Sequence, residues 1–338
     1  MRIIVLGGTQ FIGPAVVQRL CNLGHEVAIF HRGRTEANLP EKVRHFHGDR
    51  NRIADLGSEF RAYAPDVVID TGLFNEAQAM DVTMVFTHVA KRLVVLSSLD
   101  VYQAFGYILG TESGPPQSVP IREDGALRTK LYPFRDKLMT DFARKYDKIL
   151  VERTVLNNPE LPALVLRLPM VYGARDYQHR LLYWLKPMEL DKRTAIVLGK
   201  GYASQRLSRG YVENVANAIA LGALAGAGMR GVYNVADSPT LSNLEWGMEI
   251  AKCVGWDGKI ELAPDDRVPE ALRGRGQDLV ADTTKIRDEL DYRELVSLGD
   301  GLKKSVEWEL ANLPKNLTDF QLFDYAEEDK LLRQLSSS

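Results

Sequence analysis

A glycine-rich segment near the N-terminus has the composition and the position of an anion-binding turn. Residues 7–13 (GGTQFIG) stand between an apolar run at 2–6 and a helical pattern at 12–23. Glycines let the backbone approach a pyrophosphate, and the first turn of a helix offers free N–H groups and a positive dipole end. A tight turn without a ligand is the alternative. The predicted dinucleotide contacts are Gly7, Thr9, Gln10, Phe11, Ile12 and Gly13.

The segment after the next apolar run, 26–30, bears on the choice of cofactor. An acidic residue there would bind the ribose 2′-hydroxyl of NAD, whereas arginine accommodates the 2′-phosphate of NADP. The chain has no carboxylate at this point but has His31, Arg32 and Arg34. Arginine can hold a phosphate through two parallel hydrogen bonds. We therefore favour NADP over NAD and include these three residues among the cofactor contacts.

Polar residues also follow the apolar runs at 43–46 and 67–69. Ligands bind at the carboxyl ends of parallel strands, so these residues suit the same site. Asp49 could accept a hydrogen bond from the adenine amino group, although an aspartate in a turn is an equally good interpretation. The predicted contacts from these two segments are Asp49, Arg50, Asp70, Thr71 and Gly72.

The elements that position these residues follow from the spacing of the apolar runs. Short β-branched runs alternate with helical patterns, which indicates βαβ units and a Rossmann-type, doubly wound parallel sheet of the α/β class. Gly, Pro, Ser and charged residues dominate 103–135, which predicts a long loop. The expected strands are residues 2–6, 26–30, 43–46, 67–69, 92–97, 163–168 and 232–236. We expect residues 1–173 with 205–238 to form the cofactor domain, 174–204 with 239–310 a smaller mixed substrate lobe, and 311–338 a C-terminal extension.

The composition excludes several classes of protein. The 338 residues are 45% hydrophobic and 26% charged, with a formal net charge of -2, which is typical of a globular protein and makes nucleic acid an unlikely partner. Cys21 and Cys253 are far apart and form no metal-binding pattern, so we expect reduced thiols and no metal. No apolar run is long enough to cross a bilayer, and we expect a cytoplasmic protein.

Five segments together resemble the extended short-chain dehydrogenase/reductases, and among them the NAD-dependent epimerase/dehydratase family. The resemblance extends from residue 1 to about 310, and the chain looks like a divergent member. It implies a small-molecule substrate, nucleotide sugars among the candidates, and a homodimer formed through helices that include the one ending at Glu152. The segments are GGTQFIG, GDR at 48–50, SSLDVY at 97–102, RLPMVYG at 167–173 and GVYNVA at 231–236.

The resemblance also implies catalytic residues. Ser98 would supply a hydroxyl to the substrate oxygen, and Lys148 would hold the nicotinamide ribose. The family pattern YxxxK places tyrosine and lysine on one helix face, where the cation lowers the tyrosine pKa. Here Arg144 stands four residues before Lys148, and Tyr146 only two before it. Either Tyr146 precedes the helix and points freely, or Tyr102 or Tyr132 replaces it, or the proton-transfer chemistry is lost.

The remaining predictions concern the substrate and the reaction. Tyr102, Arg206 and Arg209 are candidate substrate contacts, and Pro169 is a candidate cofactor contact. The resemblance implies NAD(P)-dependent epimerisation, dehydration or reduction at a secondary alcohol or carbonyl. The alternative is a non-catalytic NAD(P)-binding protein, either an RNA-binding member or a cofactor-sensing regulator.

Overall fold

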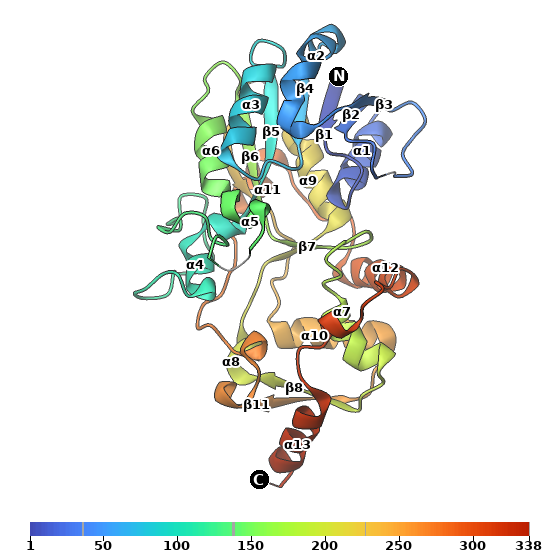
Figure 1. The fold of residues 1–338 in the computed structure, drawn as a ribbon, viewed down its shortest axis with the longest axis vertical. Helices are drawn as coiled ribbons and strands as arrows, with labels where there is room; N and C mark the ends of the chain where they lie inside the picture. Colours follow the sequence, from blue (N-terminus) through green and yellow to red (C-terminus); the bar gives the residue numbers. More distant parts are fainter. Residues whose placement is uncertain (36, 137–138, 227, 338) are drawn as a thin grey trace.

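The computed structural model describes the whole chain except residues 36, 137, 138, 227 and 338, and it has two lobes (Figure 1). The upper lobe is built on a seven-stranded sheet. Its strands are β1 (Arg2–Leu6), β2 (Glu26–His31), β3 (Arg44–His47), β4 (Val67–Asp70), β5 (Arg92–Ser98), β6 (Ala163–Leu168) and β10 (Gly231–Asn234). Their order is β10-β6-β5-β4-β1-β2-β3, and every neighbouring pair is parallel. The predicted doubly wound parallel sheet is confirmed.

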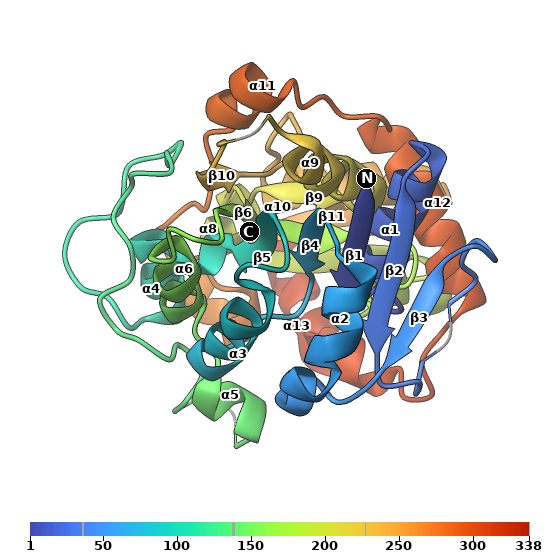
Figure 2. The same cartoon turned by 90° about the horizontal axis from the view of Figure 1, so that it is seen from above.

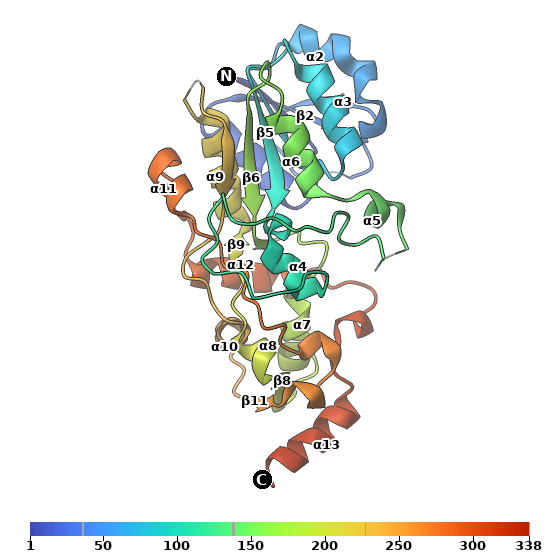
Figure 3. The same ribbon diagram turned by 90° about the vertical axis from the view of Figure 1, so that its left-hand side faces the viewer.

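Helices cover both faces of this sheet (Figure 3). Successive side chains of a strand point to opposite faces, so Ile3 and Val5 of β1 join one apolar cluster, whereas Ile4 and Leu6 join another. This explains why the central strands are largely apolar rather than alternating, whereas the edge strand β3 buries only Phe46. The covering helices are α1 (Ile12–Asn22) and α9 (Val212–Leu224) on one face, and α2 (Gly57–Tyr63), α3 (Glu76–Phe86) and α6 (Lys148–Leu156) on the other.

The strand order reverses beside β1, which lies between β4 and β2 near the middle of the sheet. In open α/β sheets a ligand crevice lies at such a switch point, beyond the carboxyl ends of the strands. Those ends point toward the second lobe in Figure 1. The edge strands β3 and β10 lie far apart when the sheet is seen from above (Figure 2).

The second lobe contains a two-stranded parallel sheet, β8 (Ala195–Gly199) with β11 (Lys259–Ala263). A short pair, β7 (Met170–Tyr172) with β9 (Arg209–Tyr211), lies where the chain passes between the lobes. The C-terminal α13 (Tyr325–Leu335) packs on β8, because buried Glu328 accepts a hydrogen bond from the Val197 amide at 2.7 Å. The other α-helices are α4 (Gln103–Leu109), α5 (Asp141–Lys145), α7 (Leu182–Leu185), α8 (Lys200–Ser204), α10 (Asn243–Val254), α11 (Thr284–Leu290) and α12 (Leu298–Ala311).

Two local predictions are corrected by the structure. The predicted loop at 103–135 begins with a helix, α4, which ends where Gly110 adopts a left-handed conformation with φ 71°. The predicted helix through residues 144–152 is interrupted, because the Asp147 side chain accepts a hydrogen bond from the Ile149 amide at 2.8 Å and starts α6 anew. Tyr146 therefore precedes the helix, in extended backbone with ψ 120°.

Candidate functional site

A cavity of about 400 Å³ opens at the carboxyl ends of β1, β2, β4 and β5. The structure places most of the predicted cofactor contacts in its wall, although Asp49 and Asp70 do not line it. The predicted residues that line it are Gly7, Thr9, Gln10, Phe11, Ile12, Gly13, His31, Arg32, Arg34, Arg50, Thr71, Gly72, Lys148 and Pro169. Residues from six separate stretches of sequence thus meet around one space.

The glycine-rich turn packs as tightly as phosphate binding requires. Gly7 and Gly8 have φ of 110° and 91°, which side chains rarely tolerate. A Cβ on Gly13 would lie 2.6 Å from the Cα of Gly8, so the helix start can approach the turn only without a side chain. No side chain caps the N-terminus of α1, and its first turn carries no acidic residue. The Gly13 amide donates to the Gln10 carbonyl at 2.9 Å, so the amides just before it are the ones that can face an anion.

Asp70 and Asp49 support the cavity from behind. Buried Asp70 forms two hydrogen bonds with Arg50, at 2.7 and 2.8 Å, and thereby fixes a guanidinium in the cavity wall. Asp49 accepts a hydrogen bond from the Asn51 amide at 2.9 Å and caps the short helix that follows. This is the turn role that was the alternative interpretation of Asp49.

The arginines after β2 reach the outer end of the cavity. Arg32 and Arg34 are exposed and line it. A 2.8 Å hydrogen bond between the hydroxyls of Thr9 and Thr35 ties their loop to the glycine-rich turn. Among the described residues that line the cavity there is no carboxylate, and two cations at this end suit an additional phosphate.

The predicted catalytic residues lie in the wall of the cavity or directly behind it. Ser98 ends β5 and lines the cavity, and its Oγ accepts a hydrogen bond from the Asp100 amide at 3.1 Å. The phenol of Tyr146 is buried; it donates a hydrogen bond to the Asp100 carboxylate and also forms one with Ser98. Tyr146 can point this way because the chain breaks helical geometry at residues 146 and 147.

The electrostatics of this group differ from the family expectation. Burial and the neighbouring Asp100 carboxylate raise the pKa of Tyr146 well above its usual range, and the hydrogen bond with Ser98 opposes this shift. Burial also raises the pKa of Asp100, whose Oδ1 has no hydrogen-bond partner among the described residues. Tyr146 is therefore the neutral donor of this pair at physiological pH, and the Asp100 carboxylate accepts its hydrogen bond.

Lys148 lies beside this group in the cavity wall. Its ammonium donates to the carbonyl oxygens of Leu73 and Leu96, at 2.5 and 2.7 Å, and lies 4.8 Å from the ring centroid of Phe74. Burial lowers the pKa of Lys148 to about 8. At neutral pH the side chain still carries its charge, held in place at the floor of the cavity.

The motifs and the fold agree with comparisons against known proteins. The model of the NAD-dependent epimerase/dehydratase family matches residues 3–236, more than half of the chain. The chain belongs to this family. Among the described residues, no helix combines the length and the apolar character that a membrane span needs.

Relatives of this epimerase/dehydratase family member differ in what they do. The chain is 31% identical over 150 residues to dTDP-glucose 4,6-dehydratase of Streptomyces niveus, which covers 44% of this chain and 42% of that protein. It is 30% identical over 175 residues to 2′-dehydrokanamycin reductase of Streptomyces kanamyceticus, covering 51% and 43%. The matched regions thus span less than half the length of either relative. The UDP-glucose 4-epimerase of Thermotoga maritima with UDP-glucose shares the fold, with a TM-score of 0.68, 19% identity, and coverage of 93% and 100%.

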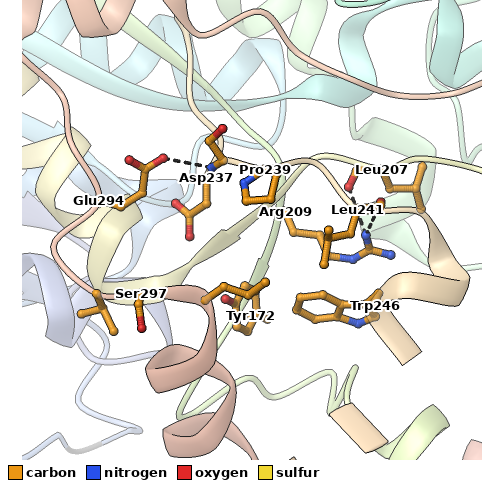
Figure 4. A pocket seen from close by; sticks show the side chains of 12 residues that line it. Tyr172, Leu207, Arg209, Asp237, Pro239, Leu241, Trp246, Glu294 and Ser297 are labelled. Atoms are coloured by element: carbon orange, nitrogen blue, oxygen red, sulfur yellow. Dashed lines mark hydrogen bonds between the residues drawn. The ribbon is translucent and has the colours of Figure 1, made fainter. Parts of the chain in front are cut away.

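Between the lobes, this family member has a second cavity of about 290 Å³. Arg180 lines both this cavity and the first, so the two spaces meet at its side chain. Arg209 lines the second cavity and also a smaller one of about 110 Å³ (Figure 4). It stacks 4.6 Å from a Trp246 ring centroid and donates to the carbonyl oxygens of Leu207 and Leu241.

Arg209 retains unused hydrogen-bonding capacity in this place. Burial lowers its pKa to about 10, and its Nε has no partner among the described residues. The hydroxyl of Tyr172, which lines the same two cavities, is buried and likewise unpartnered within the described chain. A polar ligand group between the lobes would meet two donors that the protein itself does not satisfy.

The other two predicted substrate contacts lie elsewhere. Tyr102 is fully buried; its hydroxyl donates to Asn234 at 2.7 Å and accepts from Arg167 at 2.8 Å, which joins the segment after β5 to β10 and β6. Arg206 forms an ion pair with Asp278 at 2.8 Å. Neither is among the described residues that line the three cavities.

Sequence reasoning missed several residues of this site. Asp100 stands two positions after Ser98 in SSLDVY, so a carboxylate at a strand end was a signal that could have found it. Phe74 and Thr35 line the cavity from loops whose paths no motif defines. Arg180 joins the two cavities from the segment after β7, and no spacing argument points to it.

Proposed function

We propose that this protein is an NAD(P)-dependent enzyme that transfers a hydride at a secondary alcohol or carbonyl carbon of a nucleotide sugar. The observation that carries the proposal is that Ser98 and Lys148 line the large cavity, while the hydroxyl of Tyr146, directly behind them, bonds to both Ser98 and Asp100. Epimerisation, dehydration and reduction each use such a step. The named activities of the two curated relatives, a dehydratase and a reductase, lie within this range.

The residues in the first cavity fit a dinucleotide. The amides after Gly8 would hold the pyrophosphate, and the charged Lys148 would bind the nicotinamide ribose. The bound nicotinamide supplies the hydride acceptor or donor. The protein's own contribution is to orient this group beside Ser98 and to keep water from the buried pair behind it.

The proton follows a short path in the oxidising direction. The substrate hydroxyl gives its proton to the oxygen of Tyr146, while Tyr146 gives its own proton to the Asp100 carboxylate. The hydride leaves the substrate carbon at the same time, so a carbonyl forms and the charges balance. The raised pKa of Asp100 favours its role as the final acceptor, and Ser98 orients the two oxygens.

The second cavity would hold the rest of the substrate. Arg180 lines both cavities, and Arg209 offers its unpartnered Nε from β9, between the lobes. Arginines suit a diphosphate, and Trp246 and Tyr172 provide aromatic surface for a base or sugar. A nucleotide sugar combines these groups, and the relative from Thermotoga maritima was solved with UDP-glucose.

A direct assay tests the proposed reaction. The purified protein is incubated with a panel of UDP- and dTDP-sugars and with NAD or NADP, and the products are identified by NMR. Carbon-bound deuterium that moves between sugar and nicotinamide supports the proposal. If no sugar exchanges deuterium while the dinucleotide binds tightly, the protein is a non-catalytic binder and the proposed reaction is wrong.

The identity of the cofactor yields a prediction about Arg32. We infer that Arg32 and Arg34 bind a 2′-phosphate, so NADP is preferred over NAD. The variant Arg32→Glu should lose about 10-fold or more in affinity for NADPH, roughly the effect of one charge-assisted hydrogen bond, while NADH affinity holds or rises. Fluorescence titration measures both. Arg230→Glu, with the same charge change on the exposed chain before β10, is the control; equal NADPH affinity in the two variants contradicts the assignment.

We also propose a homodimer that pairs the faces of α3 and α6. These helices pack together on the outer surface, and α3 exposes Met80 and Met84, which are 60% and 67% accessible. Leu156 at the end of α6 extends this apolar face. A glutamate at position 84 would bury a charge in the interface, so Met84→Glu should sediment as a monomer. Met248→Glu on α10 should leave the dimer intact, and a monomeric wild type would refute the proposal.

A further inference from the structure

Three of the six histidines of this chain meet at one edge of the large sheet. His31 ends β2, whereas His45 and His47 lie on the edge strand β3. One ring nitrogen of each lies within 4.8 Å of the corresponding nitrogens of the other two. None of these side chains is needed to explain the hydride-transfer chemistry proposed above.

The strand register explains why these side chains converge. In the parallel pair β2–β3, His31 is the direct partner of His47. Residues two apart on a strand share a face, so His45 joins His47 on the same side of the sheet. The Nε2 of His31 and the Nδ1 of His45 are 2.9 Å apart, and the rings of His31 and His47 lie with centroids 4.6 Å apart.

We propose that this histidine cluster, His31 with His45 and His47, is a binding site for a divalent transition metal, with Zn²⁺ as the best match. Imidazole nitrogen is a preferred ligand of zinc, and three protein ligands leave a fourth position for water. Ligand nitrogens in a tetrahedral site lie roughly 3.3 Å apart, given Zn–N bonds of about 2.0 Å. The present nitrogens lie within 4.8 Å of one another, and the exposed side chains of His45 and His47 are the ones that would rotate to reach that spacing.

The position of the histidine cluster links a bound metal to the proposed cofactor site. His31 lines the dinucleotide cavity and is followed directly by Arg32, so its ring lies at the outer rim of the proposed cofactor site. The segment from residue 32 to residue 43 leaves β2 and returns to β3, and it carries both predicted phosphate-binding arginines. A metal held by His31 and by β3 would join the two ends of this segment. A bound metal would also stabilise the folded chain, since it binds the folded state alone.

The experiment uses untagged protein, because a histidine tag would bind the same ions. Calorimetric titration with Zn²⁺ measures the stoichiometry and affinity, and the visible absorption of bound Co²⁺ reports its coordination. We expect one saturable equivalent in the wild type. His45→Ala and His47→Ala, at exposed positions, should each bind Zn²⁺ at least about 10-fold more weakly. This is the lower end of the loss expected even when a residue that only hydrogen-bonds to a metal ligand is changed.

His88→Ala is the matched control, since its side chain is 73% exposed and lies away from the cluster, 3.5 Å from Glu160. This variant should bind Zn²⁺ as the wild type does. Equal affinity in all four proteins, or uptake that does not saturate, overturns the proposal. Dinucleotide binding measured with a chelator present is a separate readout, so failure of the metal site and failure of the proposed function are distinguishable.

Discussion

Replacing Gly13 with alanine is expected to weaken dinucleotide binding by about 10- to 100-fold, because over-packing of this kind costs about 1–3 kcal/mol. The added Cβ would meet Gly8 at three backbone atoms, at 2.6, 2.7 and 2.8 Å. No rotation of a side chain relieves contacts with backbone, so the turn itself has to move away from the start of α1. The amides that would hold the pyrophosphate move with it.

Titration of NADPH fluorescence against Gly13→Ala measures the loss. Gly299→Ala is the matched control: this glycine lies in α12 with nothing within 4 Å of a new Cβ, so alanine should keep full affinity and slightly favour the helix. Thermal unfolding of both variants shows whether the chain remains folded. If folded Gly13→Ala binds NADPH as tightly as the wild type, the pyrophosphate does not lie on this turn.

The second large effect is expected at Tyr146. Tyr146→Phe removes the hydroxyl that links the substrate to Asp100, so turnover should fall by about 10²- to 10⁴-fold, the usual contribution of positioned acid–base catalysis. Dinucleotide affinity should change little, because Tyr146 is not among the described residues lining the cofactor cavity. Tyr107→Phe removes a hydroxyl that donates to the carbonyl of Ser113, away from this group, and should keep full turnover.

Asp100→Asn separates the proton path from simple packing. The relay needs an ionised Asp100, so oxidation by the wild type should decline as the pH falls through the pKa of this carboxyl, which burial raises. An amide cannot take up the proton, so Asp100→Asn should turn over slowly. Its rate should also no longer decline with falling pH as the wild-type rate does. An Asp100→Asn enzyme with the wild-type pH profile would show that Asp100 does not receive the proton.

Much of the fold could be predicted because the determining signals are local. Apolar runs such as residues 3–6 are typical of a sheet buried on both faces, and the glycine-rich segment fixes where the first strand meets the first helix. Lys148 could be found because its role depends on one position in a helix. The direction of Tyr146 could not, since it depends on whether Asp147 restarts the helix or continues it.

Contacts between distant segments were beyond sequence reasoning. Arg209 lies against Trp246, and Tyr102 bonds to Asn234, across separations that no spacing rule connects. The cysteine pattern led to a prediction of no metal, whereas the histidine cluster exists only because β2 and β3 pair in a particular register. Such sites become visible when the register is known.

The late position of α9 in the sequence has a consequence for synthesis. Five neighbouring strands of the sheet, from β5 to β3 in spatial order, are complete before residue 99. The helix α9, which packs beside α1 on one face of this sheet, ends only at residue 224. As the ribosome makes the chain, apolar residues such as Val94 and Leu166 stay uncovered until α9 emerges. The nascent chain therefore exposes apolar surface on the sheet and is prone to aggregate until α9 has been made. A chaperone that covers this surface would act during that interval.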